Sequence, residues 1–231
     1  MLSSALQPHR YHLLKALLFA AATSSTSTTV RAMATIRSVK HVGRTELSKN
    51  MRPGFSTFSL RADYESLMDP FVNLDNFWMD RPVFPPHPHA GFSAITYMFP
   101  DSEGAFLNQW SMSDDKEKID PGAIHWTQAG SGMMHEEIPE TTGENCHGLQ
   151  MFVKLPVELE LSPPRAFHVN GKDVPEYKEE EDDDGCDNVR VRVMVGSYKD
   201  KSANVLTSNE EITYLDVYLK PGAKIEIPAA K

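Results

Sequence analysis

The sequence predicts an all-β protein, a sandwich or a barrel, on three observations. Short runs rich in aromatic and β-branched residues recur at roughly 8- to 12-residue spacing from about residue 36 onward, with Pro and Gly between them. Several of these runs alternate apolar and polar residues, which is the period of a half-buried strand. No stretch carries the capped 3.6-residue apolar period of an amphipathic helix, and no βαβ repeat is present. We therefore expect packed sheets of short strands.

The expected strands follow one another along the chain. The clearest alternation lies in 149–155 and 189–195, where every second residue is apolar, so each of these strands should bury one face. The full set of expected strands is 55–62, 71–77, 92–99, 149–155, 189–195, 212–219 and 224–227.

Two features divide the chain. Pro163 and Pro164 cannot continue a strand ladder, so they mark a boundary. Residues 179–184 are a run of six acidic residues, which is typical of a solvated loop. We expect 36–160 to form an N-terminal domain with the functional site, 161–188 to form a Pro-rich and acidic linker, and 189–231 to form a smaller C-terminal segment.

Residues 1–35 differ from the rest in composition. No acidic residue precedes Glu46, Ser and Thr crowd positions 23–29, and several leucines share one helical face. This composition favours an organellar transit peptide, mitochondrial or plastid. A secretory signal with an apolar core at 16–22 is the rival interpretation, and a start at Met33 would leave a cytoplasmic or nuclear product.

Charge and composition exclude several classes of protein. The formal net charge is −9 and no basic run is visible, which disfavours direct binding to nucleic acid. Only Cys146 and Cys186 are present, so we expect neither a disulfide framework nor a Cys-based zinc site. No apolar run approaches the roughly 18 residues that a membrane span needs, so none is predicted.

The first candidate site is a pair of histidines at the start of an expected strand. His87 and His89 are two residues apart, and in an extended strand they leave the same face. They can therefore converge on one metal ion. Alone, the pair is weak evidence, since two histidines at this spacing often only hydrogen-bond to loop carbonyls.

A second pair strengthens the hypothesis of a metal site. His135 and Glu137 are also two apart, so they share a face while Glu136 points the other way. On neighbouring strands the two pairs would present three imidazoles and one carboxylate to one point. Such donors suit a divalent transition ion that keeps one or two positions for water or substrate, as in non-haem iron oxygenases. Zinc, nickel, manganese and copper remain alternatives at this point.

Other histidines near these pairs have less specific interpretations. His125 lies beside Trp126 and out of phase with either pair, which favours a packing role or a role in orienting a ligand. His147 precedes Gly148 and either orients a ligand through its ring N–H or caps a strand.

The residues of the two pairs and their neighbours resemble the pirins, which are bicupin proteins of the cupin superfamily. The match runs from about residue 40 onward in the family's order. It consists of Asp69-Pro70-Phe71, Leu74-Asp75, Phe77, Phe84-Pro85, His87-Pro88-His89, Gly91-Phe92, Pro121-Gly122, Trp126, Ala129-Gly130, Gly132, His135, Glu137 and His147-Gly148-Leu149-Gln150.

This resemblance implies a cupin-type β-sandwich or barrel with one iron ion, Fe(II) or Fe(III), in the N-terminal cupin. His87, His89, His135 and Glu137 fall on the family's four ligand positions. Several pirins open the ring of the flavonol quercetin with O₂, and family members are described as nuclear transcriptional co-regulators that depend on iron.

The sequence also departs from the family pattern. Where pirins usually have Arg and Glu after the paired histidines, this chain has Ala90 and Ser93, and a stretch of the next hairpin that usually bears a His reads 107–110, Leu-Asn-Gln-Trp. These changes concern substrate preference and the groups that orient the ligands. A pirin also continues well beyond the segment that 219–223 resembles, so we expect the second cupin unit to be partial.

Two functions follow from the resemblance. The first is a quercetin 2,3-dioxygenase that takes a flavonol and O₂, with Glu137 as the catalytic group that accepts the hydroxyl proton. The second is a redox-sensitive binding protein or transcriptional co-regulator without catalysis, whose acidic surface meets a protein partner. A cupin shell with an incidental metal is the simplest alternative. The sequence does not indicate an oligomeric state.

Overall fold

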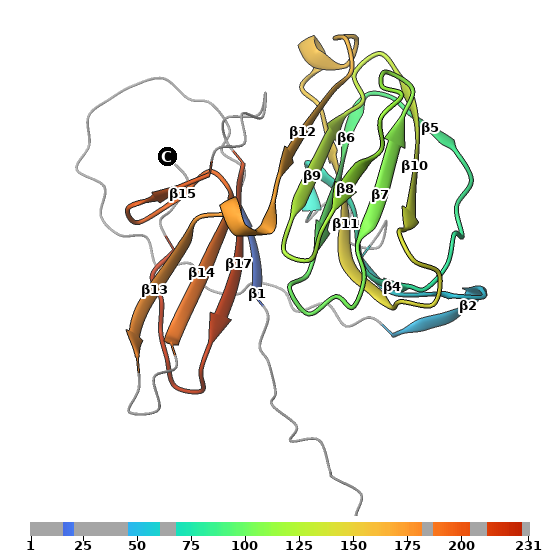
Figure 1. Cartoon of the computed structure of the whole chain (residues 1–231). Helices are drawn as coiled ribbons and strands as arrows, with labels where there is room; N and C mark the ends of the chain where they lie inside the picture. Colours follow the sequence, from blue (N-terminus) through green and yellow to red (C-terminus); the bar gives the residue numbers. More distant parts are fainter. Residues whose placement is uncertain (1–15, 21–45, 61–67, 182–186, 204–211, 228–231) are drawn as a thin grey trace, which may run out of the picture.

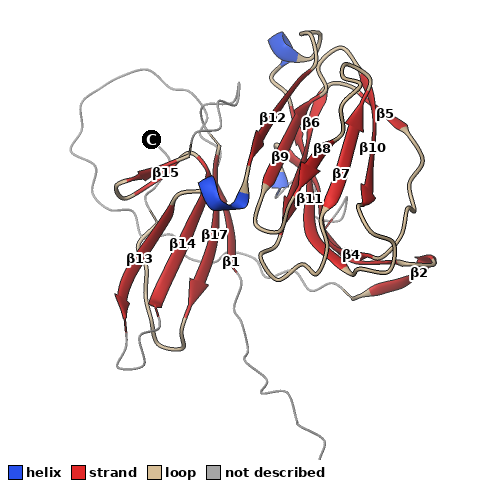
Figure 2. Cartoon of the chain, viewed as in Figure 1, coloured by secondary structure: helices blue, strands red, loops and turns tan. Residues whose placement is uncertain are grey.

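The computed structural model describes residues 16–20, 46–60, 68–181, 187–203 and 212–227, and strands make up nearly all of its regular structure (Figure 1, Figure 2). The strands are β1 (Ala16–Ala20), β2 (Ser48–Arg52), β3 (Phe55–Leu60), β4 (Phe71–Met79), β5 (His87–His89), β6 (Phe92–Met98), β7 (Phe106–Trp110), β8 (Glu117–Ile119), β9 (Ile124–Gln128), β10 (Met133–Pro139), β11 (Cys146–Lys154), β12 (Arg165–Val169), β13 (Glu176–Glu181), β14 (Asp187–Val195), β15 (Ser197–Tyr198), β16 (Lys201–Ser202) and β17 (Thr213–Leu219). Short 3₁₀ turns, η2 (Val157–Leu159) and η3 (Gly171–Asp173), lie in the connections.

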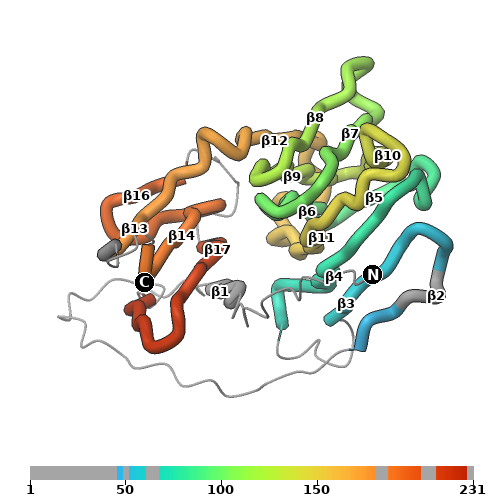
Figure 3. The backbone as a smooth tube through the Cα atoms, turned by 60° about the horizontal axis from the view of Figure 1, so that its bottom comes forward, coloured from blue at the N-terminus to red at the C-terminus, as the bar shows by residue number. Residues whose placement is uncertain are grey.

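Three of the four sheets in the described residues form three layers, and β15 and β16 pair as a small sheet of their own. The central sheet has seven strands in the order β12-β9-β6-β11-β4-β3-β2, and the strands of every described pair run antiparallel. The outer sheet, β5-β10-β7-β8, covers one face of the central sheet, and the C-terminal sheet, β1-β17-β14-β13, lies on its other side (Figure 1, Figure 3). The central sheet therefore has two interlayer spaces, one on each face.

Alternation along the central strands decides which residue enters which space. In β6, Ile95 and Tyr97 belong to a buried cluster that includes Met194 and Tyr214 of the C-terminal sheet. Met98, of the opposite parity, belongs to a second cluster with Phe106 of the outer sheet. One strand thus supplies both cores because successive side chains point to opposite faces.

A buried polar network joins the central and C-terminal sheets. The Arg192 side chain is 4% exposed, and its Nη1 donates to the Tyr97 hydroxyl at 2.8 Å while Nη2 donates to the carbonyl of Gly122 at 2.9 Å. The Tyr97 hydroxyl in turn donates to Asp216 at 2.5 Å, and Glu176 pairs with Arg192 at 3.1 Å. The two Nη groups are thus hydrogen-bonded and Nε faces the Glu176 carboxylate, which offsets the cost of burying this guanidinium.

The predicted all-β class is confirmed, and it takes the form of a sandwich, because the sheets of the described residues stay open and do not close into a barrel. The expected strand at 224–227 is wrong. These residues pair with no strand, and their apolar side chains Ile225 and Ile227 instead pack against the C-terminal sheet. The alternation of apolar residues at 224–227 therefore reflects packing against the sheet and not backbone pairing with a neighbouring strand.

The segment 161–188, expected as a linker, contains β12 and β13. β12 follows Pro163-Pro164 and pairs with β9 as the edge of the central sheet, whereas β13 pairs with β14 in the C-terminal sheet. Prolines are tolerated next to an edge strand because one side of that strand needs no partner.

Of the targeting segment predicted at 1–35, the structure describes β1 alone, which pairs with β17. Targeting therefore stays a prediction. Among the described residues, no helix has the length and apolar character needed to cross a membrane.

Candidate metal centre

The two predicted pairs lie on neighbouring strands. β5 carries His87 and His89, β10 carries His135 and Glu137, and the two strands pair antiparallel with His135 directly opposite His87 and Met133 opposite His89. Gly91 follows β5 with a φ of 74°, and its N–H donates to the carbonyl of Gly130 at 2.8 Å. This turn, which favours glycine, leads the chain from the outer sheet into β6 of the central sheet.

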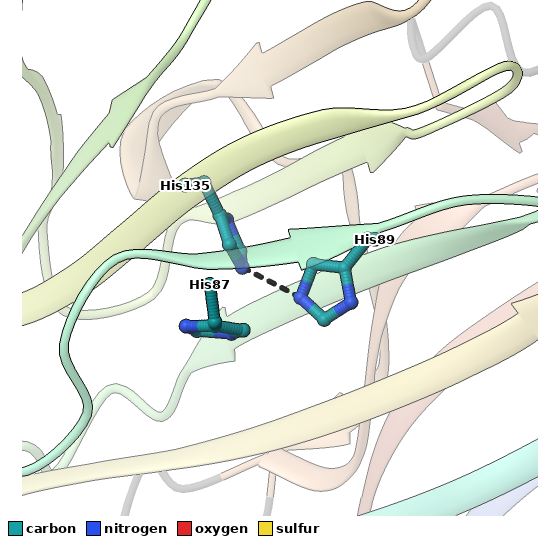
Figure 4. A group of neighbouring side chains, drawn as sticks. All are labelled: His87, His89 and His135. Carbon is teal, nitrogen blue, oxygen red and sulfur yellow. Dashed lines mark hydrogen bonds between the residues drawn. The ribbon is translucent and has the colours of Figure 1, made fainter.

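Three imidazoles gather at one point. The ligand atoms of His87, His89 and His135 lie within 4.8 Å of one another, and the rings converge from the two strands (Figure 4). The Nε2 atoms of His89 and His135 are 2.8 Å apart. The predicted convergence of these three side chains is confirmed.

In two of the rings, a hydrogen bond at Nδ1 fixes the proton there, so Nε2 carries the lone pair that a metal ion could bind. Nδ1 of His87 lies 2.9 Å from the carbonyl oxygen of Pro85, and Nδ1 of His135 lies 3.1 Å from Oδ1 of Asn108. Oxygen atoms of this kind only accept, so both Nδ1 atoms carry the proton. The Nε2 atoms then face the cluster unprotonated, which is the state a metal ligand needs.

Burial keeps His89 and His135 neutral. Burial lowers the pKa of His89 to about 4 and that of His135 to about 3, and repulsion from the neighbouring imidazoles acts in the same direction. At neutral pH both rings are therefore uncharged, and a cation would displace only the proton that His89 Nε2 donates to His135 Nε2. The donor set fits a divalent transition ion.

Glu137 occupies the same cavity in a different way. Its carboxylate is not among the three groups within 4.8 Å of one another, but its side chain is 8% exposed and lines the cavity beside the histidines. Thr96 of β6 contacts Oε1 of Glu137 at 2.5 Å. Burial raises the pKa of Glu137 to about 7, and the hydrogen bond from Thr96 opposes this rise. Its role as fourth ligand stays a prediction.

The cavity at the centre measures about 620 Å³ and is mainly apolar. Phenylalanines from several strands form its walls, and polar groups enter from β4, from β11 and from the predicted ligands. The aromatic members are Phe55, Phe77, Phe84, Phe106 and Phe152. A volume of this size with aromatic walls and few polar groups is typical of a site for a small organic molecule.

The structure shows where the other histidines near the site lie, whose roles the sequence did not decide. His125 is buried and is linked to His135 through Asn108, which agrees with both the packing and the orienting interpretation. His147 lies on the other face of the central sheet, where it bonds to Asp101 and Asn76 and stacks on Trp78, so it orients no predicted ligand. Asn108 and Thr96 were not singled out from the sequence.

One departure from the family pattern lies away from the site. Ser93 has the parity of Ile95 and Tyr97 in β6, and it pairs with Gln128 and Val153. It is therefore on the face turned toward the C-terminal sheet, and the Glu usual at this position would not point at the histidines.

Comparison with known proteins agrees with this geometry. A family model described as Pirin matches residues 35–153, which include both predicted pairs and most of the central and outer sheets. The chain belongs to the pirin family. A pirin-like protein from Arabidopsis thaliana is 34% identical over 164 residues, covering 69% of this chain and 49% of the relative. Pirin from Homo sapiens is 32% identical over 165 residues, covering 71% of this chain and 53% of the relative.

Solved structures show the same fold. A crystal structure from Geobacillus kaustophilus is 28% identical, with a TM-score of 0.71 over 83% of this chain and 72% of that one. A quercetin 2,3-dioxygenase from Acinetobacter baumannii, 24% identical, has a TM-score of 0.56 over 70% of this chain and 57% of its own, and shows the fold alone. The chain spans about half the length of the curated pirins that it matches.

Proposed function

We propose that this pirin-family chain is a metal-dependent dioxygenase of the quercetin 2,3-dioxygenase type, with a flavonol and O₂ as substrates. One observation carries the proposal: three imidazoles gather in an aromatic-walled cavity of about 620 Å³. A Pseudomonas aeruginosa protein provisionally named quercetin 2,3-dioxygenase is 31% identical over 166 residues and supports the reaction class.

Iron is the proposed metal, with His87, His89, His135 and Glu137 as its ligands. Three imidazoles and a carboxylate suit non-haem iron and leave positions open, although zinc, nickel, manganese or copper could use the same donors. When bound, the metal supplies Lewis-acid and redox chemistry toward the flavonol and O₂. Glu137 would complete the set through its other carboxylate oxygen, Oε2, while Oε1 keeps the hydrogen bond from Thr96.

The cavity walls favour a planar aromatic substrate. Phe77 and Phe106 stack with a centroid distance of 5.4 Å, and Phe55 meets Phe84 edge-on at 5.1 Å near the opening. Arg52 lies over the Phe84 ring at 4.9 Å and donates to the carbonyl of Val83 at 2.7 Å, which holds a cation at the rim. This environment binds a flat ring system and attracts an ionised phenol.

Glu137 is the proposed catalytic base. Burial raises its pKa to about 7 in the metal-free protein, near the working pH of a general base, and as a metal ligand it would have to loosen from the ion before it accepts a proton. The carboxylate lines the same cavity as the imidazoles, so it is placed to accept the proton of the flavonol hydroxyl. The hydrogen bond from Thr96 orients Oε1 for this role.

The test is an assay of the iron-loaded protein with quercetin in air. We expect loss of the flavonol absorbance band together with O₂ uptake, and loss of both on Glu137→Gln. A folded, iron-loaded sample that leaves quercetin unchanged would contradict the proposal and favour the alternative function, an iron-dependent co-regulator that binds a protein partner through its acidic surface.

A further inference from the structure

A row of polar residues crosses the central sheet opposite the metal centre. Strand register places six residues side by side, each directly opposite the next on the neighbouring strand. In spatial order they are Ser59 (β3), Asp75 (β4), Gln150 (β11), Thr96 (β6), His125 (β9) and His168 (β12), called here the polar rung.

The polar rung is unusual for its position. Asp75, Thr96 and His125 are buried and Gln150 is half-buried, whereas the neighbouring row on one side is apolar across its centre, with Gly148 opposite both Phe77 and Met98. Burying polar side chains costs stability unless each is hydrogen-bonded, so the partners of these side chains show what purpose the rung serves. The contacts of Thr96 and His125, which pair directly with each other, indicate that purpose.

Thr96 holds Glu137 across the interlayer space. Its Oγ1 is 2.5 Å from Oε1 of Glu137 on β10 and 2.8 Å from Oε1 of Gln150, the next member of the rung. The contact joins the central sheet to the outer sheet. It therefore limits how far the Glu137 carboxylate can turn about its side-chain dihedrals.

His125 holds His135 through Asn108. Asn108, fully buried on β7, donates from Nδ2 to Nε2 of His125 at 3.1 Å and accepts from Nδ1 of His135 at 3.1 Å. The bond to His125 sets the orientation of the amide, because it places the Nδ2 group toward the central sheet. Oδ1 then faces His135 and keeps its proton on Nδ1.

Both ligands of β10 are therefore supported from one cross-strand pair of the central sheet. We propose that Thr96 and His125, the latter through Asn108, are positioning residues that set the ligand geometry of Glu137 and His135. The inference rests on the metal centre of the proposed function. It explains why the rung is polar at Thr96 and His125.

The test measures binding of Co²⁺, whose visible spectrum reports ligand geometry, to the full chain. We expect Thr96→Val and Asn108→Leu each to weaken Co²⁺ binding by about 10- to 100-fold, the usual effect of removing a partner of a metal ligand, and to change the spectrum. Thr96→Ser keeps the hydroxyl and His125→Gln keeps an acceptor for Asn108, so both should retain near wild-type affinity and spectrum.

The matched control is Thr127→Val. Thr127 is buried on β9 like His125, and no hydrogen bond to a predicted ligand is present for it among the described residues. Equal losses in Thr127→Val and Thr96→Val would overturn the inference, as would wild-type Co²⁺ affinity and spectrum in Thr96→Val and Asn108→Leu.

The pair Thr96→Val and Thr96→Ser decides the matter even where Asn108→Leu does not fold, because valine is close to threonine in shape. No step of this test requires turnover of a flavonol, so an inactive enzyme with the expected Co²⁺ results contradicts the proposed activity alone. A wild-type chain that binds no Co²⁺ contradicts the metal centre and this inference together.

Discussion

The two faces of the central sheet have the same strands but opposite contents. Toward the C-terminal sheet the space is filled by a continuous apolar cluster, with one buried charged network around Arg192. Toward the outer sheet lie a cavity of about 620 Å³, the polar rung and three imidazoles. One face is packed for stability, and the other keeps space and polar groups for a ligand.

The contrast is sharpest in two adjacent residues of β6. Tyr97 donates to Asp216 and accepts from Arg192 in the packed space, whereas Thr96 contacts Glu137 in the hollow one. Substitutions on the two faces should therefore separate stability from metal binding.

The largest expected effect is the loss of metal on His89→Ala. Removing one of the three gathered imidazoles should lower the metal content of the purified protein from about one equivalent to nearly none, because the ion would keep only two imidazoles and the Glu137 carboxylate, which is not gathered with them. Elemental analysis after gel filtration measures it. His147→Gln, on the opposite face, is the control and should stay loaded; equal metal content in both variants would break the comparison.

The next effect concerns the packed face. Arg192→Met should lower the free energy of unfolding by about 3–5 kcal/mol, since it leaves the partners of a buried guanidinium unpaired. Urea unfolding measures this loss. Metal affinity of the folded fraction should not change. A large fall in affinity would show that the two faces are not independent.

In the metal-free protein, the buried histidines and Glu137 on the cavity side of the central sheet should make the free energy of unfolding depend on pH. Burial lowers the pKa of His89 to about 4 and that of His125 and His135 to about 3, so below about pH 6.5 the unfolded state binds their protons first and stability falls as pH falls. Glu137, with its pKa raised to about 7, acts in the opposite sense: its contribution is full below about pH 4.5 and is lost as pH rises through 7.

Three histidines outweigh one carboxyl, so the free energy of unfolding should decrease from pH 6.5 to pH 5 by up to roughly 1.4 kcal/mol per pH unit for each net proton. Urea midpoints in chelator measure the slope, and His125→Gln should reduce it. A metal-free protein that is more stable at pH 5 than at pH 6.5 would contradict this assignment.

The smallest effect is expected at the surface. Lys118→Met removes exposed ion pairs to Glu140 at 2.8 Å and Asp120 at 3.3 Å, which should change the free energy of unfolding by less than about 1 kcal/mol. If Lys118→Met lowered the free energy of unfolding as much as Arg192→Met does, burial would not explain why the two charged groups differ in their contribution to stability.

Local patterns predicted the ligand pairs because strand periodicity alone decides that residues two apart share a face. His87, His89 and His135 could therefore be grouped from spacing and from family resemblance. The support that Thr96 and Asn108 give to these side chains could not be predicted in this way. It depends on how the central and outer sheets are stacked, and no spacing within one strand encodes that stacking.

The C-terminal region shows the same limit. The alternation at 189–195 predicted β14 correctly. At 224–227 the same alternation reflects Ile225 and Ile227 packing on the sheet without a partner strand. The linker expected at 161–188 contains edge strands of two sheets, since the prolines come just before β12 and do not interrupt it.

The most direct test of the metal centre is anomalous diffraction at the iron edge from crystals of the iron-loaded protein. We predict a single peak about 2.0–2.2 Å from Nε2 of His87, His89 and His135, with the Glu137 carboxylate turned toward it. A peak elsewhere, or none in a crystal that contains stoichiometric iron, would contradict the account.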